Sequence, residues 1–446
     1  MCRSPLLSVA LFFLLLTGIG PHHFTEARGA EPKTELKVVT DRPEAIYKAG
    51  EAVNFQISLL RDGQPLEDAE LHFLLSLDGA KTISEGKLTS QKEPVKVTGS
   101  LDKPGFLRCT VTWKTGDKAN STALAGAAID PQAIPPSLPV PDDFDAFWDE
   151  QKKQLATVAL APVLTPIPSP SPDIASFDVQ IPCIGPGVSG YYSRPSQAKP
   201  KSCPAVLYVH GAGVRSSVQG SANGAAKLGR LGLDINAHGI PNGKPDTFYA
   251  ELANGELKDY RYAGRESRDT SYFRLMYLRL IRALDFLTAQ PEWDGKVLVV
   301  TGHSQGGGQS IVAAGIDPRV TGFATGVPAM CDHSGEAAGR INGWPRLVPR
   351  DSDGKPNAKI LEASRYVDAM NFATRTKAEA IFSVGFIDTV CPPTSVYAAY
   401  NNVSGKKEMV IEPLMGHAAP PKIMEQFNVW IAAHIERVHG RSDAAK

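Results

Sequence analysis

The stretch VLVVTGHSQGGGQS, residues 297–310, indicates the fold class of this chain. Five apolar or β-branched residues are typical of a buried strand, and a pattern of small residues typical of a closely packed helix follows. Between them lies G-x-S-x-G, formed by Gly302, Ser304 and Gly306. In a nucleophile elbow, a strained strand-to-helix turn projects a serine hydroxyl above the sheet, and flanking glycines leave room for the neighbouring backbone. The stretch therefore predicts a nucleophilic serine at position 304.

Strands and helices alternate along the chain around this motif. A helix is expected over residues 271–289, because its apolar residues recur every three or four positions and form a single stripe. Apolar strands interleaved with amphipathic helices predict a mostly parallel sheet covered on both faces, with the chemistry at the carboxyl edge. The expected strands occupy residues 204–211, 231–239, 296–304, 381–385 and 408–413.

Residues 31–129 show a different period. Apolar residues alternate in AVNFQISLL and in LHFLLSL, and each run ends in an Asp-Gly turn, at residues 62–63 and 78–79. This pattern predicts β-hairpins, and several of them predict a smaller all-β, immunoglobulin-like sandwich. No candidate catalytic cluster is expected in this domain.

The proline-rich segment 130–142 predicts a stiff, extended linker. Asp142 or Asp143 is the expected N-cap of a following helix, whose apolar face would carry Phe144, Phe147 and Trp148. The catalytic domain is therefore expected over residues 143–440, consistent with the two domains that a chain of 446 residues favours.

Residues 1–30 are expected to be a secretory signal peptide. One arginine precedes an apolar run over residues 6–16, which is too short to span a bilayer as a helix. An uncleaved membrane anchor is the alternative. The mature protein is expected to be secreted or periplasmic, with no membrane association.

Charge and cysteine usage exclude several classes of partner. Lys plus Arg equals Asp plus Glu, at 47 each, which leaves no net field for nucleic acid or anionic lipid. Removal of the signal leaves five scattered cysteines without a C-x-x-C pair, which argues against a zinc site or a disulfide-dense scaffold. Cys183 and Cys203 are the first pair to test for a disulfide.

A serine nucleophile needs a base and an acid. In folds that carry a nucleophile elbow, these residues follow along the chain in the order serine, acid, histidine. His417 follows an expected strand, whereas His439 falls in the last helix and is expected to be solvated. Asp388 lies on a loop after an expected strand and is the preferred acid. Asp368 is the competitor, but it lies in a helical pattern and is interpreted as a structural acceptor.

The oxyanion formed by attack needs two N–H donors. The amide of Gln305, directly after the serine, is one candidate, and the amide of Ala212 in HGAGVRSS is the other. His210 is interpreted as a residue that braces this loop rather than as a base, and His303 as a packing residue.

On these motifs, residues 139–435 resemble the acetyl xylan esterase / cephalosporin C deacetylase family of carbohydrate esterases. The matching motifs are PDDFDAFWDEQKKQL, VLYVHGAG, GHSQGG, YVDAMNFA, SVGFIDTVCPPTSVYAAYN and the Gly-His pair at residues 416–417. The resemblance implies an α/β-hydrolase fold with Ser304 as nucleophile, Asp388 as acid and His417 as base. It also implies oxyanion amides at Ala212 and Gln305.

Two departures from the family pattern stand out. The usual R-G-Q motif is replaced by NAHGIPNG, from Asn236, and the glutamate that normally follows the histidine is replaced by Ala418. Both features brace the site or its assembly rather than perform the chemistry. Hydrolysis is therefore expected to survive them, while oligomer formation stays open.

The sequence thus predicts a secreted serine esterase that acts on acetylated carbohydrate without a metal or other cofactor. The alternatives are a peptidase or a carboxylester hydrolase for longer acyl chains, because the elbow does not specify the acyl group. A non-catalytic carbohydrate-binding or adhesion protein, with the sandwich as its working part, is the alternative from another class.

Overall fold

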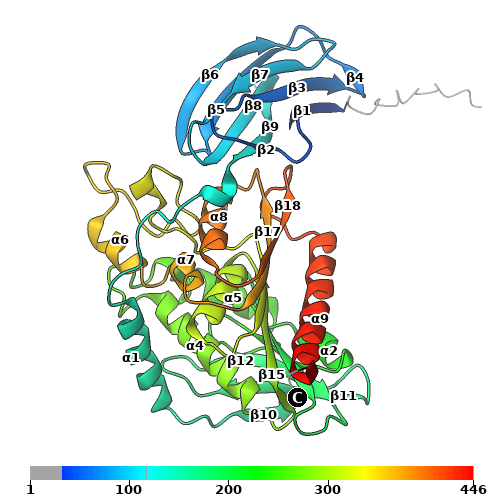
Figure 1. The fold of residues 1–446 in the computed structure, drawn as a ribbon, viewed down its shortest axis with the longest axis vertical. Coiled ribbons are helices and arrows are strands. Elements are labelled where there is room, and N and C mark those ends of the chain that lie inside the picture. Colours follow the sequence, from blue (N-terminus) through cyan, green and yellow to red (C-terminus); the bar gives the residue numbers. More distant parts are fainter. Residues whose placement is uncertain (1–32, 116–117, 445–446) are drawn as a thin grey trace, which may run out of the picture.

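The computed structural model describes residues 33–115 and 118–444, which form an all-β part followed by an α/β part (Figure 1). The predicted signal peptide, residues 1–30, lies outside the described residues. Within the described ranges, no helix is both long enough and apolar enough to cross a membrane.

The all-β part, called here the β-domain, comprises residues 34–129 and contains two sheets. One has the order β1-β3-β4, with β7 paired to β3, and the other has the order β2-β9-β8-β5-β6. Buried residues of both sheets form one hydrophobic core, so the arrangement is a two-sheet sandwich. Its immunoglobulin-like character stays a prediction. The strands are β1 (Thr34–Thr40), β2 (Ile46–Tyr47), β3 (Val53–Arg61), β4 (Gln64–Pro65), β5 (Glu70–Leu77), β6 (Lys81–Thr89), β7 (Val95–Gly99), β8 (Gly105–Thr115) and β9 (Lys118–Ile129).

The period-two pattern accounts for these strands. Along β3 the residues alternate between buried and part-exposed positions, and the predicted face of β8 is buried in the same way. Asp62 (φ 50°) and Asp78 (φ 45°) occupy the left-handed turn conformation, each followed by a glycine that also has positive φ. The two predicted Asp-Gly hairpins, β3–β4 and β5–β6, are confirmed.

The linker contains a short 3₁₀ helix, η1 (Pro131–Ala133), and then runs without regular structure to α1 (Phe144–Ala156). The predicted apolar face of α1 is buried. Asp143 occupies the N-cap position, but its side chain makes no capping bond. Its carboxylate accepts a hydrogen bond from Arg268 at 2.6 Å instead. The predicted N-cap position is therefore confirmed, although the side chain itself does not cap the helix.

The α/β part is built on one mixed sheet of order β10-β11-β12-β14-β13-β15-β16-β17-β18. The pairings from β10 to β14 are antiparallel, and those from β14 through β13 to β18 are parallel. The predicted mostly parallel sheet is therefore confirmed for this region. The strands are β10 (Val163–Pro166), β11 (Ile174–Ile181), β12 (Val188–Pro195), β13 (Cys203–Val209), β14 (Leu231–Ile235), β15 (Trp293–His303), β16 (Gly322–Gly326), β17 (Glu379–Gly385) and β18 (Lys407–Glu412).

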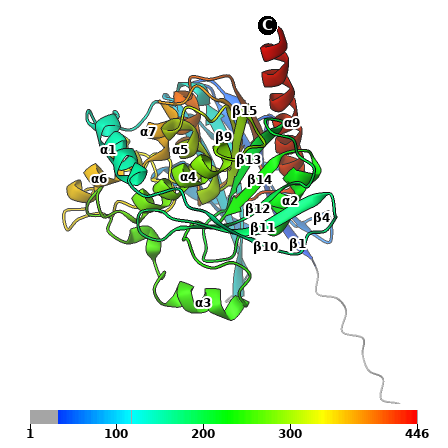
Figure 2. The same cartoon turned by 90° about the horizontal axis from the view of Figure 1, so that it is seen from below.

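Helices cover both faces of this sheet (Figures 1 and 2). The larger core joins one face to helices that include α1, α4 and α5, and a smaller core joins the opposite face to α9. Figure 2 shows α9 and α4 on opposite sides of the strands. The helices are α2 (Gln219–Lys227), α3 (Asp246–Asn254), α4 (Tyr272–Thr288), α5 (Gln305–Ile316), α6 (Ala358–Ser364), α7 (Ala369–Ala373), α8 (Pro393–Asn402) and α9 (Pro421–Ala444), with 3₁₀ turns η2 (Tyr260–Tyr262) and η3 (Gly335–Ala338).

The described cysteines are free thiols. The pair Cys183 and Cys203 is therefore not a disulfide, and this expectation was wrong. Cys203 begins β13 in the middle of the sheet and is buried, whereas Cys183 lies just after β11, and two strands, β12 and β14, separate β11 from β13 in the sheet order. Closeness along the chain did not place the two residues on adjoining strands.

Candidate active site

Ser304 lies at the turn between β15 and α5, where the sequence predicted an elbow. Its backbone has φ 56° and ψ −122°, a conformation that non-glycine residues adopt at a cost of about 1–3 kcal/mol. The Ser304 amide donates to the carbonyl of Gly326 at 2.8 Å, and its carbonyl accepts from the amide of Gly308 at 3.0 Å. These bonds hold the strained residue between a neighbouring strand and its own helix.

The glycines around the serine are required by space. A Cβ at Gly302 would lie 2.4 Å from the Val209 carbonyl oxygen, and one at Gly306 would lie 2.2 Å from the same atom. A Cβ at Gly308 would lie 2.3 Å from the carbonyl oxygen of Ala329. The sequence interpretation of Gly302 and Gly306 as places of close backbone approach is confirmed, and the contact at Gly308 is a further one.

His417 links the serine to an acid. Its Nε2 lies 2.9 Å from the Ser304 Oγ, and its Nδ1 lies 2.8 Å from the Asp388 Oδ2. The other Asp388 oxygen accepts hydrogen bonds from the amides of Val390 and Cys391, both at 2.8 Å. Asp388 is fully buried, whereas His417 retains a quarter of its side-chain exposure. The structure thus brings the three predicted residues together in the order serine, histidine, acid.

Asp368, the competing acid, is occupied elsewhere. Its carboxylate caps α7 by accepting from the amide of Met370, and it also accepts from the amides of Asp332 and His333. Burial raises its pKa to about 7, with the nearby Asp332 acting in the same direction. The interpretation of Asp368 as a structural acceptor is confirmed.

His439 is placed differently from the expectation. Its Nε2 lies 2.9 Å from the Asp294 Oδ2, and the side chain is only about a third exposed. The expectation that it would be solvated is therefore wrong in part, because α9 places this residue beside Asp294, near the start of β15.

The loop after β13 carries Ala212 and is braced by two histidines. His210 Nδ1 lies 2.6 Å from the Gly211 carbonyl oxygen, and its Nε2 accepts from the Ala237 amide at 3.0 Å. His238 Nε2 lies 3.1 Å from the Gly213 carbonyl oxygen. Burial lowers the pKa of His210 to about 3 and that of His238 to about 4, so both rings are neutral near pH 7. The bracing role predicted for His210 is confirmed, whereas His238 was missed.

The backbone positions suit the two predicted oxyanion donors. Gln305 is the first residue of α5, where helix amides have no partner within the helix. A Cβ at Gly211 would lie 3.6 Å from the Ser304 Cβ, so the loop that carries Ala212 passes beside the serine. The buried Gln305 side chain accepts a hydrogen bond from the Tyr260 hydroxyl, which fixes the start of the helix. Sequence reasoning missed Tyr260 because η2 lacks any periodic signal.

His303 packs beside the elbow, as expected. Its ring stacks on Phe427 of α9 with centroids 5.2 Å apart, and burial lowers its pKa to about 4.

Within the described chain, Asp388, Cys391 and His417 are a group whose ligand atoms could hold a metal ion, all within 4.8 Å of one another. Two of these ligand atoms, the His417 Nδ1 and the Asp388 Oδ2, already bind each other at 2.8 Å.

Residues 133–434 match the family model described as acetyl xylan esterase (AXE1). The chain belongs to the acetyl xylan esterase family. Membership makes this chain a carboxylic ester hydrolase of the carbohydrate esterase type. The β-domain precedes the matched residues.

Individual relatives agree with the family. The acetyl esterase Axe7A of Xylanibacter ruminicola is 28% identical over 410 residues, which cover 89% of this chain and 90% of that protein. The acetyl xylan esterase from Paenibacillus sp. R4 is 27% identical, has a TM-score of 0.59, and aligns over 68% of this chain and 98% of its own. Acetyl xylan esterase 1 from Thermoanaerobacterium sp. JW/SL YS485, at 22% identity and a TM-score of 0.54 over 68% of this chain and 97% of its own, shows the shared fold.

Proposed function

We propose that this chain is a secreted serine esterase that removes acetyl groups from carbohydrate, with Ser304 as nucleophile, His417 as base and Asp388 as acid. The observation that carries the proposal is the pair of contacts through His417, at 2.9 Å to Ser304 and 2.8 Å to Asp388. Both lie within the reach of proton transfer. The strained elbow supports the same assignment, because such conformations cluster at functional sites.

The reaction proceeds in two halves. Ser304 Oγ attacks the acetyl carbonyl carbon while His417 Nε2 takes the hydroxyl proton, and the proton passes to the sugar oxygen as its bond to the acetyl group breaks. Water then attacks the acetyl-serine with His417 as base, which releases acetate and restores the serine. Asp388 holds the Nδ1–H tautomer and stabilises the charged imidazole. The amides of Gln305 and Ala212 stabilise the oxyanion in both halves.

Exposure of the site supports a polymer-borne substrate. The hydrogen bond between Ser304 and His417 lies at the surface, so an acetyl group on a large sugar chain reaches the serine without entering a deep cavity. The relatives named for acetyl xylan and acetyl esters support the small acyl group. Secretion rests on the predicted signal at residues 1–30. We propose an immunoglobulin-like sandwich domain over residues 31–129, which includes the β-domain, a linker over 130–142 and a catalytic domain over 143–440.

The decisive experiment replaces Ser304 by Ala and measures turnover of 4-nitrophenyl acetate and labelling by an organophosphate. We expect the wild type to hydrolyse the ester and take up the label at Ser304. The variant should lose both while keeping the wild-type Tm, because the hydroxyl is the only group removed. Unchanged turnover by a folded S304A variant would overturn the proposal.

A second measurement tests the acyl group and the sugar. Acetate release from acetylated xylo-oligosaccharides is compared with hydrolysis of the matching butyrate ester. We expect efficient deacetylation and a lower kcat/KM for butyrate. A preference for butyrate, or cleavage of peptide amides instead, would transfer the proposal to another hydrolase class.

A further inference from the structure

The loop that carries Asp388 is held from outside the catalytic domain. It connects β17 to α8, and its amides at Val390 and Cys391 bind the Asp388 side chain. Within the α/β part the loop is also held by longer backbone hydrogen bonds, from Phe386 to Glu412 at 3.4 Å and from Ile387 to Met415 at 3.3 Å. The main chain of Asp388 is bound by the β-domain: Arg108 on β8 donates from Nη2 to the Asp388 carbonyl oxygen at 3.0 Å. The two residues are 280 positions apart in the sequence. The β-domain therefore lies over the carboxyl end of β17, beside the site (Figure 1).

Arg108 is itself fixed by a buried ion pair. Its Nη2 lies 2.5 Å from the Asp78 Oδ1, and the two side chains are only 5% and 2% exposed. A buried pair of this kind contributes little net stability because both charges lose water, but it defines geometry and is costly to break on one side. The guanidinium is therefore held in one place, directed at the Asp388 loop.

Asp78 continues the contact to the far end of the loop. Its Oδ2 accepts from the Thr394 hydroxyl at 2.6 Å and from the Thr394 amide at 3.3 Å, at the start of α8. Asp78 belongs to the β5–β6 turn, and a Cβ on the next residue, Gly79, would lie 2.8 Å from the Arg108 Nη1. The turn glycine thus leaves the space that the guanidinium occupies. Together, Arg108 and Asp78 bind the acid loop at Asp388 itself and at Thr394, where the loop enters α8.

Apolar contacts complete this junction. The ring of Phe106 packs edge-on against Phe386, two residues before Asp388, with centroids 5.0 Å apart. A Cβ at Gly126 of β9 would lie 2.3 Å from the Phe386 carbonyl oxygen, so strand and loop backbones are in direct contact. Phe106 belongs to the core of the α/β part rather than to that of the β-domain. The acid loop and the β-domain therefore pack as one body.

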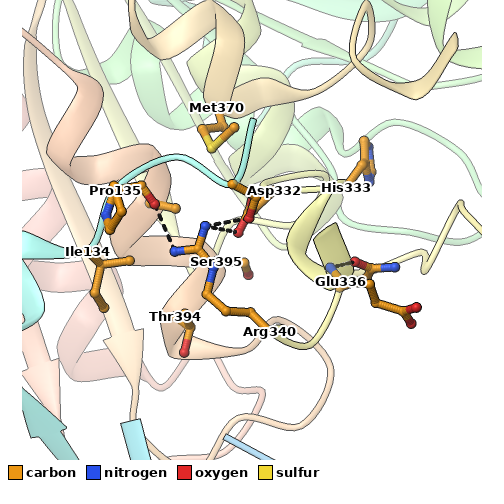
Figure 3. A network of polar contacts seen from close by, with 12 residues as sticks. Ile134, Pro135, Asp332, His333, Glu336, Arg340, Met370, Thr394 and Ser395 are labelled. Carbon is orange, nitrogen blue, oxygen red and sulfur yellow. Dashed lines mark hydrogen bonds and ion pairs between the residues drawn. The ribbon is translucent and has the colours of Figure 1, made fainter. Parts of the chain in front are cut away.

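The linker is also bound along its course. Arg340 donates from Nη1 to the Pro135 carbonyl oxygen at 2.8 Å and forms a buried ion pair with Asp332 at 3.1 Å (Figure 3). Asn401 of α8 donates to the carbonyl oxygens of Pro131 and Ile134 at 3.0 and 2.9 Å. Domains that move independently are joined by a linker that makes few contacts. This linker is instead hydrogen-bonded to the α/β part at several carbonyl oxygens.

From this geometry we propose that the β-domain is part of the catalytic apparatus, and that Arg108 and Asp78 are positioning residues that hold the Asp388 loop in register with His417. The proposal rests on the proposed function, because it needs Asp388 as the acid. It assigns a role to the part of the chain that precedes the family match at residue 133.

The experiment uses the full-length protein and three variants. Arg108→Met removes the contact to Asp388 but leaves the Asp78 carboxylate buried without its partner. The double variant D78N/R108M removes the charge pair as a unit and keeps an acceptor for Thr394, so it isolates the positioning contact. Arg42→Met is the matched control, because its guanidinium bonds Glu51 and the Ile46 carbonyl within the β-domain.

We measure Tm, KM and kcat per active site, with the active sites counted by organophosphate titration. Loss of positioning should lower kcat about 10- to 100-fold in the double variant, since small displacements of catalytic groups cost this much. KM should stay within about twofold, because binding of the ester does not involve the acid loop.

Three results separate the possibilities. A folded double variant with wild-type Tm and wild-type kcat per active site would overturn the positioning role. A lower Tm with unchanged kcat per titrated site would show that the junction only stabilises the fold, and this result would also overturn the positioning role. Activity in S304A would instead overturn the proposed function, whatever the Arg108 variants show.

Discussion

His238 lies 3.1 Å from the carbonyl oxygen of Gly213 through its Nε2, while its Nδ1 lies 2.7 Å from the Tyr272 hydroxyl. The tautomer that satisfies both contacts carries its proton on Nε2. This ring stands in NAHGIPNG, the segment that replaces the R-G-Q motif of the family. The chain therefore braces the loop beside Ser304 with a neutral imidazole.

Replacing His238 by Ala should lower kcat about tenfold with little change in KM, because the loop that presents the Ala212 amide loses one of its anchors. Burial lowers the pKa of His238 to about 4, so the ring stays neutral and the deficit should be the same at pH 6 and pH 8. Steady-state kinetics on an acetate ester at both pH values checks this expectation.

His72→Ala is the matched control, because that histidine is exposed on the β-domain beside Glu70. His238→Gln should recover part of the activity, since its amide can still donate to a carbonyl. Wild-type kcat in a folded H238A variant would show that the loop needs no such brace.

The two aspartates that competed in the sequence can be separated by matched substitutions. Asp388→Asn should lower kcat about 10³- to 10⁴-fold, because an amide holds the wrong His417 tautomer. Asp368→Asn should leave kcat within a fewfold of the wild type and lower Tm, because the amide replaces one of the acceptor oxygens that bind three backbone amides. Active-site titration and thermal unfolding of both variants decide between them. The reverse pattern would make Asp368 the acid.

The sequence allowed much of this site to be predicted, for a physical reason. The elbow is a local structure whose strand, glycines and serine lie within ten residues or so, and the hydrolase chain order then narrows the choice of Asp388 and His417. Their catalytic roles stay predictions, while their proximity is observed. The buried face of α1 and the buried stripe of α4 also followed from periodicity, but α4 is buried beyond its stripe, at Arg279 and Arg282 among others.

Contacts between distant segments left no such signal. In the sequence, Arg108 is one residue of an alternating strand and Asp78 is one residue of an Asp-Gly turn. In the structure, both side chains are buried against a loop that lies some 300 residues away in the sequence. His439 was interpreted as solvated because its partner Asp294 lies 145 positions earlier. Polar pairs of this kind depend on tertiary packing, which a pattern of apolar residues does not specify.

The elbow glycines give a prediction with a built-in control. Gly306→Ala should abolish activity or prevent folding, because its Cβ would lie 2.2 Å from the Val209 carbonyl oxygen. Gly224→Ala, inside α2, meets no atom within 4 Å and should raise stability by about 0.5–1 kcal/mol without changing kcat. Soluble yield, Tm and kcat of the two variants check the pair. A fully active G306A variant would contradict the backbone contact at the elbow.

Glu379, at the start of β17, predicts a pH-dependent contribution to stability. Burial by itself would raise its pKa, but hydrogen bonds from Arg437 and His434 on α9 outweigh this effect and lower the pKa from 4.5 to about 2. A carboxylate whose folded pKa lies below its unfolded value stabilises the fold above the unfolded pKa, and this stabilisation is lost as pH falls toward the folded value. The ionised Glu379 should therefore contribute about 2–3 kcal/mol to the free energy of unfolding at pH 7 and progressively less between pH 4.5 and 2.

Glu379→Gln should lower Tm by about 4–8 °C at pH 7, and the difference from the wild type should shrink steadily below pH 4.5. Thermal unfolding from pH 7 down to the lowest pH at which the wild type stays folded checks both parts. Glu436→Gln, at an exposed position on the same helix, is the control and should show no comparable difference. A Tm deficit for E379Q that stays constant through pH 3 would mean that the helix is held by packing alone, because only an ionised Glu379 can lose its attraction to Arg437 on acidification.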